Sequence, residues 1–247
     1  MPYYSDIVQR IGQATWISTF DGKASYWQCL VRADHQWLTA FVCDEGMFEW
    51  VRTPFGMKSS GSTFVRAIQQ VLRPLKPWAD SYVDDTTVFS HGWTLHLRHA
   101  TSFLQRIREC GLTLNLKKCN SAQHEVKFCG QIVGGGKRRA DPDKVASVKD
   151  IQAPETKTQV CQVLGFFSWF GDYIPDFASH AKPLTDLIAK RVPNRIIWGR
   201  AQQDAFEMLK GLLCKATINP LEIIDFSKPQ TYSLTPVIMQ WGHTQSN

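Results

Sequence analysis

The sequence has no long hydrophobic run and no cysteine motif. No uninterrupted apolar stretch in the 247 residues approaches the 18 or so that a membrane-spanning helix needs, so we expect no membrane segment. The first residues, MPYYSD, lack the basic-then-apolar layout of a signal peptide. The seven cysteines are an odd number without a Cys-x-x-Cys pair, which argues against a disulfide framework and a zinc knuckle. We therefore expect an intracellular protein that keeps free thiols, is not secreted and does not engage a membrane.

The sequence also lacks internal repeats and low-complexity linkers. With 43% hydrophobic and 20% charged residues, its composition is typical of a globular protein that holds one large domain or two small ones. The net charge of +6 is uneven, because residues 106–150 contain ten Lys or Arg and only five Asp or Glu. The densest point is KRR at residues 137–139. Such a stripe suits a phosphate backbone, although a basic run is more often a solvated loop.

Two adjacent acids, Asp84 and Asp85, lie between short β-prone runs at residues 81–83 and 86–89. This pattern predicts a tight β-hairpin with both carboxylates at or beside its turn. Acids are common in turns because they hydrogen-bond their own backbone, so the hairpin alone requires no function. Adjacent carboxylates repel each other, however, and a divalent cation between them and further oxygen ligands makes the arrangement favourable.

A third acid, Asp21, ends a β-prone segment at residues 16–20. This order suits two-metal phosphoryl transfer: one acid ends a strand, a long insert follows, and an acid pair lies on a hairpin. In such a site, carboxylates from separate strands hold two Mg²⁺ about 3.5–4 Å apart, one at the attacking 3′-oxygen and one at the leaving pyrophosphate. The sequence therefore predicts that Asp21, Asp84 and Asp85 bind two Mg²⁺, with Mn²⁺ as an alternative.

These residues resemble two catalytic motifs of reverse transcriptases. Residues 82–85 (YVDD) resemble the Tyr-x-Asp-Asp box, and residues 18–21 (STFD), followed by YWQ at 26–28, resemble the first catalytic motif. The resemblance is to the polyproteins of gypsy-type long-terminal-repeat retrotransposons and extends from about Ile7 to about Pro229. It implies an RNA-directed DNA polymerase that transfers a nucleotide from a dNTP to a primer 3′-hydroxyl. The implied partner is an RNA or DNA template-primer duplex.

The resemblance also implies roles for residues around the acids. Tyr26 would lie under the sugar of the incoming nucleotide and exclude a 2′-hydroxyl, and the pair Phe55 and Gly56 would pack on the nascent base pair. Lys118, with Lys117 as the less favoured alternative, would protonate the departing pyrophosphate as a general acid. The residues expected in the substrate site are Gly22, Tyr26, Phe55 and Gly56, and those in the primer grip are Phe128, Cys129 and Gly130.

The expected fold class is α+β. Residues 1–140 are expected to form a polymerase palm with a remnant of the fingers, in which helices back a small antiparallel sheet. A helical thumb and connection would occupy residues 141–225, and residues 226–247 would be a truncated lead-in to a ribonuclease H domain with an irregular tail. The predicted helices are 5–14, 59–72, 94–110, 144–150, 158–170, 181–190 and 201–215. The predicted strands include 16–21, 39–42, 47–51 and 112–116, and a further hairpin is predicted at 125–133.

A second hypothesis is not enzymatic. In the resembled family, a fingers subdomain with cations for the triphosphate precedes the first motif, whereas 20 residues precede Asp21 here. Gly61 and Val65 stand where the family usually has Pro and Gln. These departures favour a catalytically dead or co-opted fragment that binds nucleic acid or a protein partner. The intact carboxylates favour the polymerase.

Overall fold

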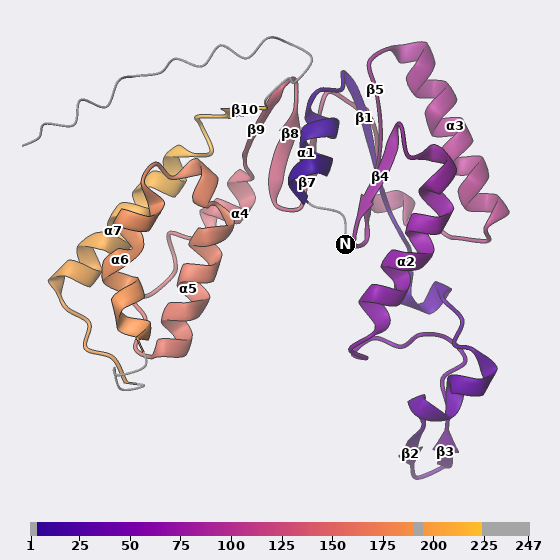
Figure 1. Cartoon of the computed structure of the whole chain (residues 1–247), viewed down its shortest axis with the longest axis horizontal. Coiled ribbons are helices and arrows are strands. Elements are labelled where there is room, and N and C mark those ends of the chain that lie inside the picture. The colour runs from indigo at the N-terminus through magenta and orange to yellow at the C-terminus, as the bar shows by residue number, and fades with distance from the viewer. Residues whose placement is uncertain (1–3, 190–194, 224–247) are drawn as a thin grey trace, which may run out of the picture.

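The computed structural model describes residues 4–189 and 195–223, which form two lobes joined by a β-sheet (Figure 1). The first lobe holds an antiparallel sheet with helices, and the second lobe is helical. Within these ranges, no helix has the length and apolar character that crossing a membrane requires. The predicted α+β class is confirmed.

The sheet of the first lobe has the strand order β4-β5-β1-β6. Its strands are β1 (Trp16–Asp21), β4 (Ala79–Tyr82), β5 (Asp85–Ser90) and β6 (Asn120–Gln123). β1 and β5 are antiparallel in a continuous register from Trp16 opposite Ser90 to Asp21 opposite Asp85. Because side chains alternate along a strand, Ile17 and Phe89 face one side of this sheet and Phe20 faces the other.

Each face of this sheet is covered by a separate apolar core. α2 (Ser60–Leu72) and α3 (Trp93–Glu109) cover the face of Phe20, where Phe64 and Phe103 are buried. α1 (Tyr4–Gly12) and the hairpin of β7 (Glu125–Phe128) and β8 (Gln131–Gly134) cover the face of Ile17. The two cores hold β1 and β5 in the centre of the lobe.

A second four-stranded sheet, β10-β9-β8-β7, joins the lobes. The sequence predicted its β7–β8 hairpin, which is confirmed, but it did not predict β9 (Lys137–Ala140) or β10 (Leu221–Glu222). β10 pairs with β9 through Leu221 opposite Arg138. This pairing connects the end of the helical lobe to the sheet.

The helical lobe contains four α-helices around one apolar core. These helices are α4 (Pro142–Ala146), α5 (Lys157–Trp169), α6 (Phe177–Thr185) and α7 (Arg200–Lys215). α5 begins with a capping box between Thr156 and Gln159, which satisfies free backbone N–H groups at the helix start.

Short 3₁₀-helices occur in both lobes. They lie at Ser25–Gln28, Ala33–Thr39, Arg73–Leu75, Leu116–Lys118, Gly171–Tyr173 and Asp186–Ile188.

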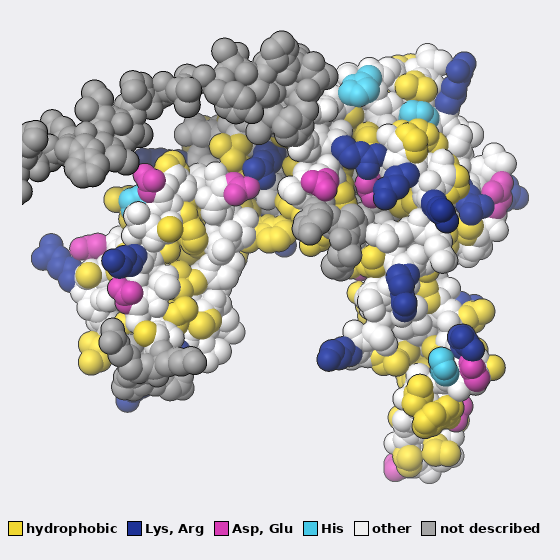
Figure 2. Space-filling view, viewed as in Figure 1, with side chains coloured by type: hydrophobic (Ala, Val, Ile, Leu, Met, Phe, Trp, Pro, Cys, Tyr) yellow, Lys and Arg dark blue, Asp and Glu magenta, His cyan; other side chains and the backbone are white. Residues whose placement is uncertain are grey.

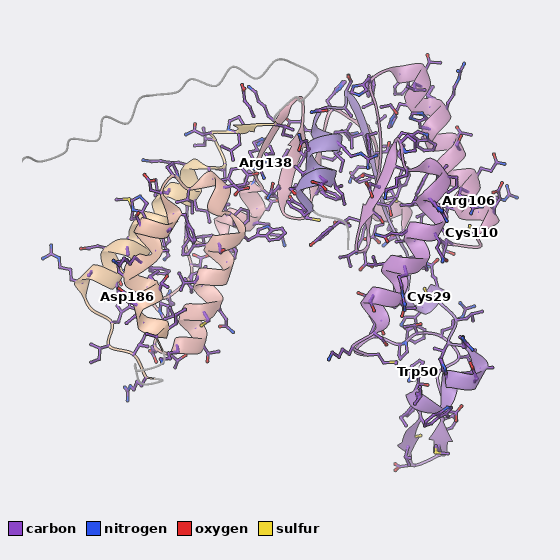
Figure 3. All side chains as sticks on the ribbon, in the orientation of Figure 1. Cys29, Trp50, Arg106, Cys110, Arg138 and Asp186 are labelled. Atoms are coloured by element: carbon purple, nitrogen blue, oxygen red, sulfur yellow. The ribbon has the colours of Figure 1, made fainter. Side chains whose placement is uncertain are left out.

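A two-stranded arm projects from the first lobe (Figure 1). β2 (Phe41–Cys43) and β3 (Gly46–Phe48) form the predicted hairpin with shorter strands, and every residue in them is exposed. Figure 2 shows hydrophobic side chains gathered on this arm. Trp50 lies at its base, with its ring 5.7 Å from that of Phe41 (Figure 3).

Several predicted elements were wrong or shorter. The strand at residues 112–116 is absent: Leu114 makes one isolated bridge to Gly22, after which the chain turns into a 3₁₀-helix. α4 is shorter than residues 144–150, because Asp141 caps a helix that starts at Pro142 and ends at Ala146. α6 starts at Phe177 and ends at Thr185 rather than spanning 181–190, and Lys190 lies outside the described residues. The predicted tail at 226–247 also lies outside the described residues. The predicted domain boundaries stay predictions.

The buried ring of Phe103 is a direct test of this packing. Its side chain is fully buried, and its ring centroid lies 4.5 Å from that of Phe20. We expect Phe103→Ala to lower the free energy of unfolding by about 3–5 kcal/mol, because it leaves a cavity behind the central strand. Urea unfolding followed by circular dichroism measures this loss. Phe48→Ala on the exposed arm is the control and is expected to change stability by less than about 1 kcal/mol; similar losses in both variants would contradict this packing.

Candidate active site

Two of the three predicted acids lie directly opposite each other. Asp21 ends β1, Asp85 begins β5, and the two residues form a pair in the antiparallel register. Residues paired in this way carry their side chains on the same face with Cβ atoms about 4.5–5.5 Å apart. The sheet therefore brings together two carboxylates that are 64 positions apart in the chain.

Asp84 lies in the turn between β4 and β5. Tyr82 pairs with Asp85, so Val83 and Asp84 form the turn. The predicted hairpin is present with Asp84 in its turn and Asp85 beside it, but Val83, which was expected in the first strand, lies in the turn. Val83 has a φ angle of 55°, which a β-branched residue rarely adopts. A residue in this region costs on the order of 1–3 kcal/mol and persists only where the surrounding structure enforces it. The flanking strand pairs supply that constraint and fix the position of Asp84.

The three carboxylates affect one another electrostatically. Burial raises the pKa of Asp84 above its ordinary value of 3.8, and the charge of Asp21 raises it further, while Ser25 and Lys118 oppose the shift. Burial likewise raises the pKa of Asp85, and the charges of Asp21 and Asp84 add to it. The site thus disfavours full ionisation of its acids unless positive charge is added.

Asp84 has an unsatisfied oxygen. Its Oδ1 atom is buried and has no hydrogen-bond partner within the described part of the chain. A cation would supply the missing partner and offset the repulsion among the three carboxylates, so these residues fit an oxygen-preferring divalent ion. Among residues 4–189 and 195–223, however, no three His, Cys, Asp or Glu side chains are already arranged to hold a metal. Metal binding by Asp21, Asp84 and Asp85 therefore stays a prediction.

Lys118 lies beside the acids, as the resemblance implied. It ends the 3₁₀-helix Leu116–Lys118, and its Nζ atom is 3.6 Å from Oδ2 of Asp21. This helix is held against β1 by the backbone N–H of Asn115, which donates to the carbonyl of Asp21 at 2.8 Å. The side chain of Lys118 is 66% exposed, so its ammonium group is accessible to a ligand. Its role as an acid stays a prediction.

Of the four residues predicted for the substrate site, Gly22 directly follows Asp21, and Tyr26 and Phe55 contact each other. The Tyr26 ring lies 5.2 Å from the ring of Phe55, which is 60% exposed. Gly56 follows with a φ angle of 89°, a conformation that favours glycine. A Cβ atom on Gly22 would lie 2.8 Å from Oγ of Ser25, so the turn after Asp21 has no room for a side chain.

Sequence reasoning missed the role of Ser25. This residue is buried, and its hydroxyl occupies the space that a side chain at position 22 would need. The hydroxyl donates a hydrogen bond to the Gly22 carbonyl at 3.0 Å, and Ser25 also lowers the pKa of Asp84. It thereby links the turn after Asp21 to the acid pair. The only signal in the sequence was its position four residues after Asp21, which is too common to indicate a role.

The predicted primer grip is a tight two-residue turn between β7 and β8. Cys129 and Gly130 have φ angles of 49° and 79°, the pattern of a type I′ hairpin turn. Sγ of Cys129 lies 3.9 Å from Oδ2 of Asp85, and burial raises the pKa of this thiol to about 12. The thiol is therefore protonated at neutral pH and contacts the carboxylate without adding charge.

Phe128 does not have the accessibility that a primer contact requires. Strand alternation directs its ring into the core below the sheet, where it is 1% exposed and stacks on Tyr4 at 6.1 Å. Its ring cannot contact a primer in this structure, because α1 covers it. Phe128 thus positions the turn, while Cys129 and Gly130 face the pocket next to it.

That pocket connects Asp85 to the helical lobe. It has a volume of about 570 Å³, and its lining includes Asp85, the turn of Cys129 and Gly130, Lys144 and Trp169. Trp169 is 44% exposed. Its position along α5 agrees with this exposure, since the buried stripe of α5 is Val160, Val163 and Phe167, and Trp169 lies off it.

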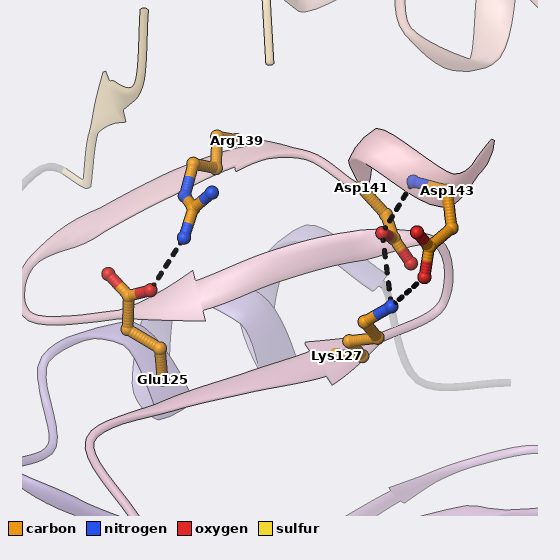
Figure 4. A network of polar contacts seen from close by, with 5 residues as sticks. All are labelled: Glu125, Lys127, Arg139, Asp141 and Asp143. Atoms are coloured by element: carbon orange, nitrogen blue, oxygen red, sulfur yellow. Dashed lines mark hydrogen bonds and ion pairs between the residues drawn. The ribbon is translucent and has the colours of Figure 1, made fainter. Parts of the chain in front are cut away.

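The basic run at residues 137–139 is largely neutralised by internal partners. Arg138, at the junction of the lobes in Figure 3, contacts Asp172 at 2.8 Å. Arg139 contacts Glu125 at 2.8 Å, and Lys127 contacts Asp143 and, at 3.4 Å, Asp141 (Figure 4). Arg138 and Arg139 are therefore poor candidates for binding phosphate, because in strand β9 both already contact acids of the same chain.

Comparison with known proteins assigns the family. The model of the family "Reverse transcriptase (RNA-dependent DNA polymerase)" matches residues 2–133, more than half of the chain, so the chain belongs to this family. It is 29% identical over 241 residues to the retrovirus-related Pol polyprotein from transposon gypsy of Drosophila melanogaster. The aligned region covers 93% of this chain and 23% of that polyprotein. The predicted resemblance to gypsy-type elements is confirmed.

Other relatives are viral. The enzymatic polyprotein of cauliflower mosaic virus (strain Strasbourg) is 30% identical over 211 residues, which are 85% of this chain and 30% of that protein. The chain therefore spans between about a quarter and a third of these relatives. The foamy viral protease-reverse transcriptase, solved in complex with double-stranded DNA, superposes with a TM-score of 0.79 at 25% identity over 87% of this chain and 38% of that one.

The raised pKa of Asp85 predicts a pH-dependent stability. A carboxyl group with a raised folded-state pKa contributes stability below its unfolded-state pKa of about 3.9, and this contribution is lost as the pH rises through the folded-state value. We expect Asp85→Asn to be increasingly more stable than the parent chain as the pH rises above about 4, in EDTA. Urea unfolding at a series of pH values measures the difference. Asp44→Asn, in the exposed arm turn, is the control; a constant difference for Asp85→Asn would contradict the coupling of the carboxylates.

Proposed function

We propose that this chain is the polymerase portion of a reverse transcriptase, an RNA-directed DNA polymerase that extends a primer with dNTPs. The observation that carries the proposal is the position of Asp21, Asp84 and Asp85 on β1 and the β4–β5 turn of a reverse-transcriptase fold. We further infer that residues 1–140 act as the palm and residues 141–225 as the thumb and connection. An intracellular location is part of the same proposal.

The reaction forms a bond between the primer 3′-oxygen and the α-phosphorus of the dNTP. The 3′-hydroxyl loses its proton to solvent, the bond from this phosphorus to the bridging oxygen of the pyrophosphate breaks, and the pyrophosphate leaves with that electron pair. Asp21, Asp84 and Asp85 would hold two Mg²⁺ or Mn²⁺, which when bound stabilise charge on the attacking and leaving oxygens. Lys118, whose Nζ atom lies 3.6 Å from Oδ2 of Asp21, would give a proton to the pyrophosphate.

The aromatic neighbourhood would position the nucleotide. The rings of Tyr26 and Phe55 lie 5.2 Å apart and would form a surface on which a sugar and a base pair pack. The open Gly56, where a Cβ would meet nothing within 4 Å, leaves room for a base beside this surface. We infer that Tyr26 excludes a 2′-hydroxyl by occupying the space under the sugar.

The duplex would lie along the pocket between the lobes. Cys129 and Gly130 are inferred to contact the primer terminus, and Lys144 and Trp169 line the same pocket from the helical lobe. The foamy viral enzyme has been solved with double-stranded DNA and with an RNA/DNA hybrid, which supports a duplex as the substrate of this chain. Trp169 offers an exposed ring that can pack against a sugar or a base.

A nucleic-acid-binding fragment without polymerase activity is the second candidate. It rests on Gly61 and Val65, which stand where the resembled family usually has Pro and Gln. The two candidates share the duplex and differ only in chemistry. Activity that depends on the carboxylates separates them.

Primer extension tests the polymerase. We expect the chain to add dNTPs to a labelled primer on an RNA template, only with Mg²⁺ or Mn²⁺, and Asp85→Asn to reduce the rate by at least about 100-fold. Gel electrophoresis of the products measures this rate, and Asp44→Asn is the control with the same change of charge. No extension by the parent chain, or equal extension by Asp85→Asn, would leave the nucleic-acid-binding fragment as the better account.

A further inference from the structure

A pocket outside the carboxylate site lies at the open edge of the first sheet. Its volume is about 460 Å³, and it is formed by the last turns of α2, the 3₁₀-helix Arg73–Leu75 and strand β4. β4 is the edge strand of this sheet and pairs only with β5 among the described strands. The pocket shares no lining residue with the pocket that contains Asp85. It is therefore a separate feature of the molecule.

The helix side of this pocket is mostly polar. Arg66, Gln69 and Gln70 of α2 and Arg73, the first residue of the following 3₁₀-helix, have the spacing i, i+3, i+4 and i+7, which places them on one side of the helix. Phe64 and Ile68 are packed on the buried face of α2, and Leu72 of that face also borders the pocket. The helix thus has one face for the core and a mostly separate one for the pocket.

The positive charge of the pocket is not neutralised within the described residues. Arg66, Arg73 and Lys76 are exposed, and none of them forms an ion pair in residues 4–189 and 195–223. The one acid that lines the pocket, Asp80, is paired with Arg10 at 2.6 Å. The α2 sequence contains no acidic residue.

The helix dipole explains only part of this arrangement. Cations near the last turn are stabilised by the carbonyl end of a helix, which accounts for Arg73 and Lys76. Arg66 lies in the middle of α2, where the dipole gives no such benefit. Figure 2 shows more Lys and Arg than Asp and Glu over the lobe of α2 and α3, so an anion meets attractive potential there.

The chemistry of the lining identifies the class of ligand. Guanidinium groups bind phosphate oxygens through paired N–H donors. The amides of Gln69 and Gln70 each offer a donor and an acceptor, the pair that reads the edge of a base. Leu72 and Ala79 border the pocket and are buried. Its volume lies within the range of about 300–1,000 Å³ that is typical of small-ligand sites.

We propose that this α2–β4 pocket binds a nucleotide, with its phosphate on Arg66, Arg73 and Lys76 and its base at Gln69 and Gln70. The nucleotide can be free or can belong to a single-stranded nucleic acid, since both carry the same phosphate and base. The site is independent of the carboxylates and of the proposed polymerase activity.

The test is fluorescence anisotropy in EDTA with two probes, a labelled eight-nucleotide oligodeoxyadenylate and a labelled ATP. The pocket variant carries Arg66→Gln and Arg73→Gln, which keep helix propensity and remove two charges. The matched control carries Arg98→Gln and Arg108→Gln, two exposed arginines of the neighbouring α3 that do not line the pocket. Far-ultraviolet circular dichroism checks that both variants are folded.

We expect the pocket variant to bind the oligonucleotide at least about tenfold more weakly at low salt, with a salt slope lower by about 1.4 if both arginines meet phosphates. The control is expected to stay within about twofold of the parent chain. A matching loss of ATP binding would identify free nucleotides as a source, and a loss confined to the oligonucleotide would identify single strands. Equal losses in pocket and control variants, unchanged binding in the pocket variant, or no binding by the parent chain would overturn the proposal.

Discussion

The antiparallel pairing of β1 with β5 is the constraint on which the rest of this structure depends. Its register sets Asp21 against Asp85 and leaves Val83 and Asp84 as the whole turn to β4. A shift by one residue would send every side chain of β1 to the opposite face and separate the two carboxylates. The position of the candidate site and the burial of two apolar cores are therefore fixed by the same set of backbone hydrogen bonds.

The two apolar cores stabilise the β1–β5 pair although the β4–β5 turn at its end is energetically unfavourable. Three features oppose folding near the turn: repulsion among the acids, the left-handed Val83, and Oδ1 of Asp84, which has no hydrogen-bond partner among the described residues. α2 and α3 on one face and α1 with the β7–β8 hairpin on the other hold the strands despite these costs. Like-charge groups kept together in this way are characteristic of functional sites rather than of parts that serve stability alone.

Local patterns in the sequence predicted the helices, the hairpins and the three acids. They succeeded where the pattern repeats, as in α3 and α7, and where a turn is short, as at Asp84. They failed where long-range contacts decide. The strand expected at residues 112–116 has only Gly22 as a bridge partner, and the basic run at 137–139 meets Asp172 and Glu125 from distant elements. The burial of Phe128 and the exposure of Trp169, in contrast, follow the alternation of β7 and the buried stripe of α5, which are local patterns.

Together, Asp21, Asp84 and Asp85 are proposed to bind divalent cations. We would titrate the parent chain and Asp21→Asn with Mn²⁺ and follow the loss of the free-ion signal by electron paramagnetic resonance. Removal of one oxygen ligand and one negative charge is expected to weaken binding at least about tenfold, whereas the exposed Asp44→Asn is expected to leave it unchanged. Equal Mn²⁺ affinity in the parent chain and in Asp21→Asn would contradict the account.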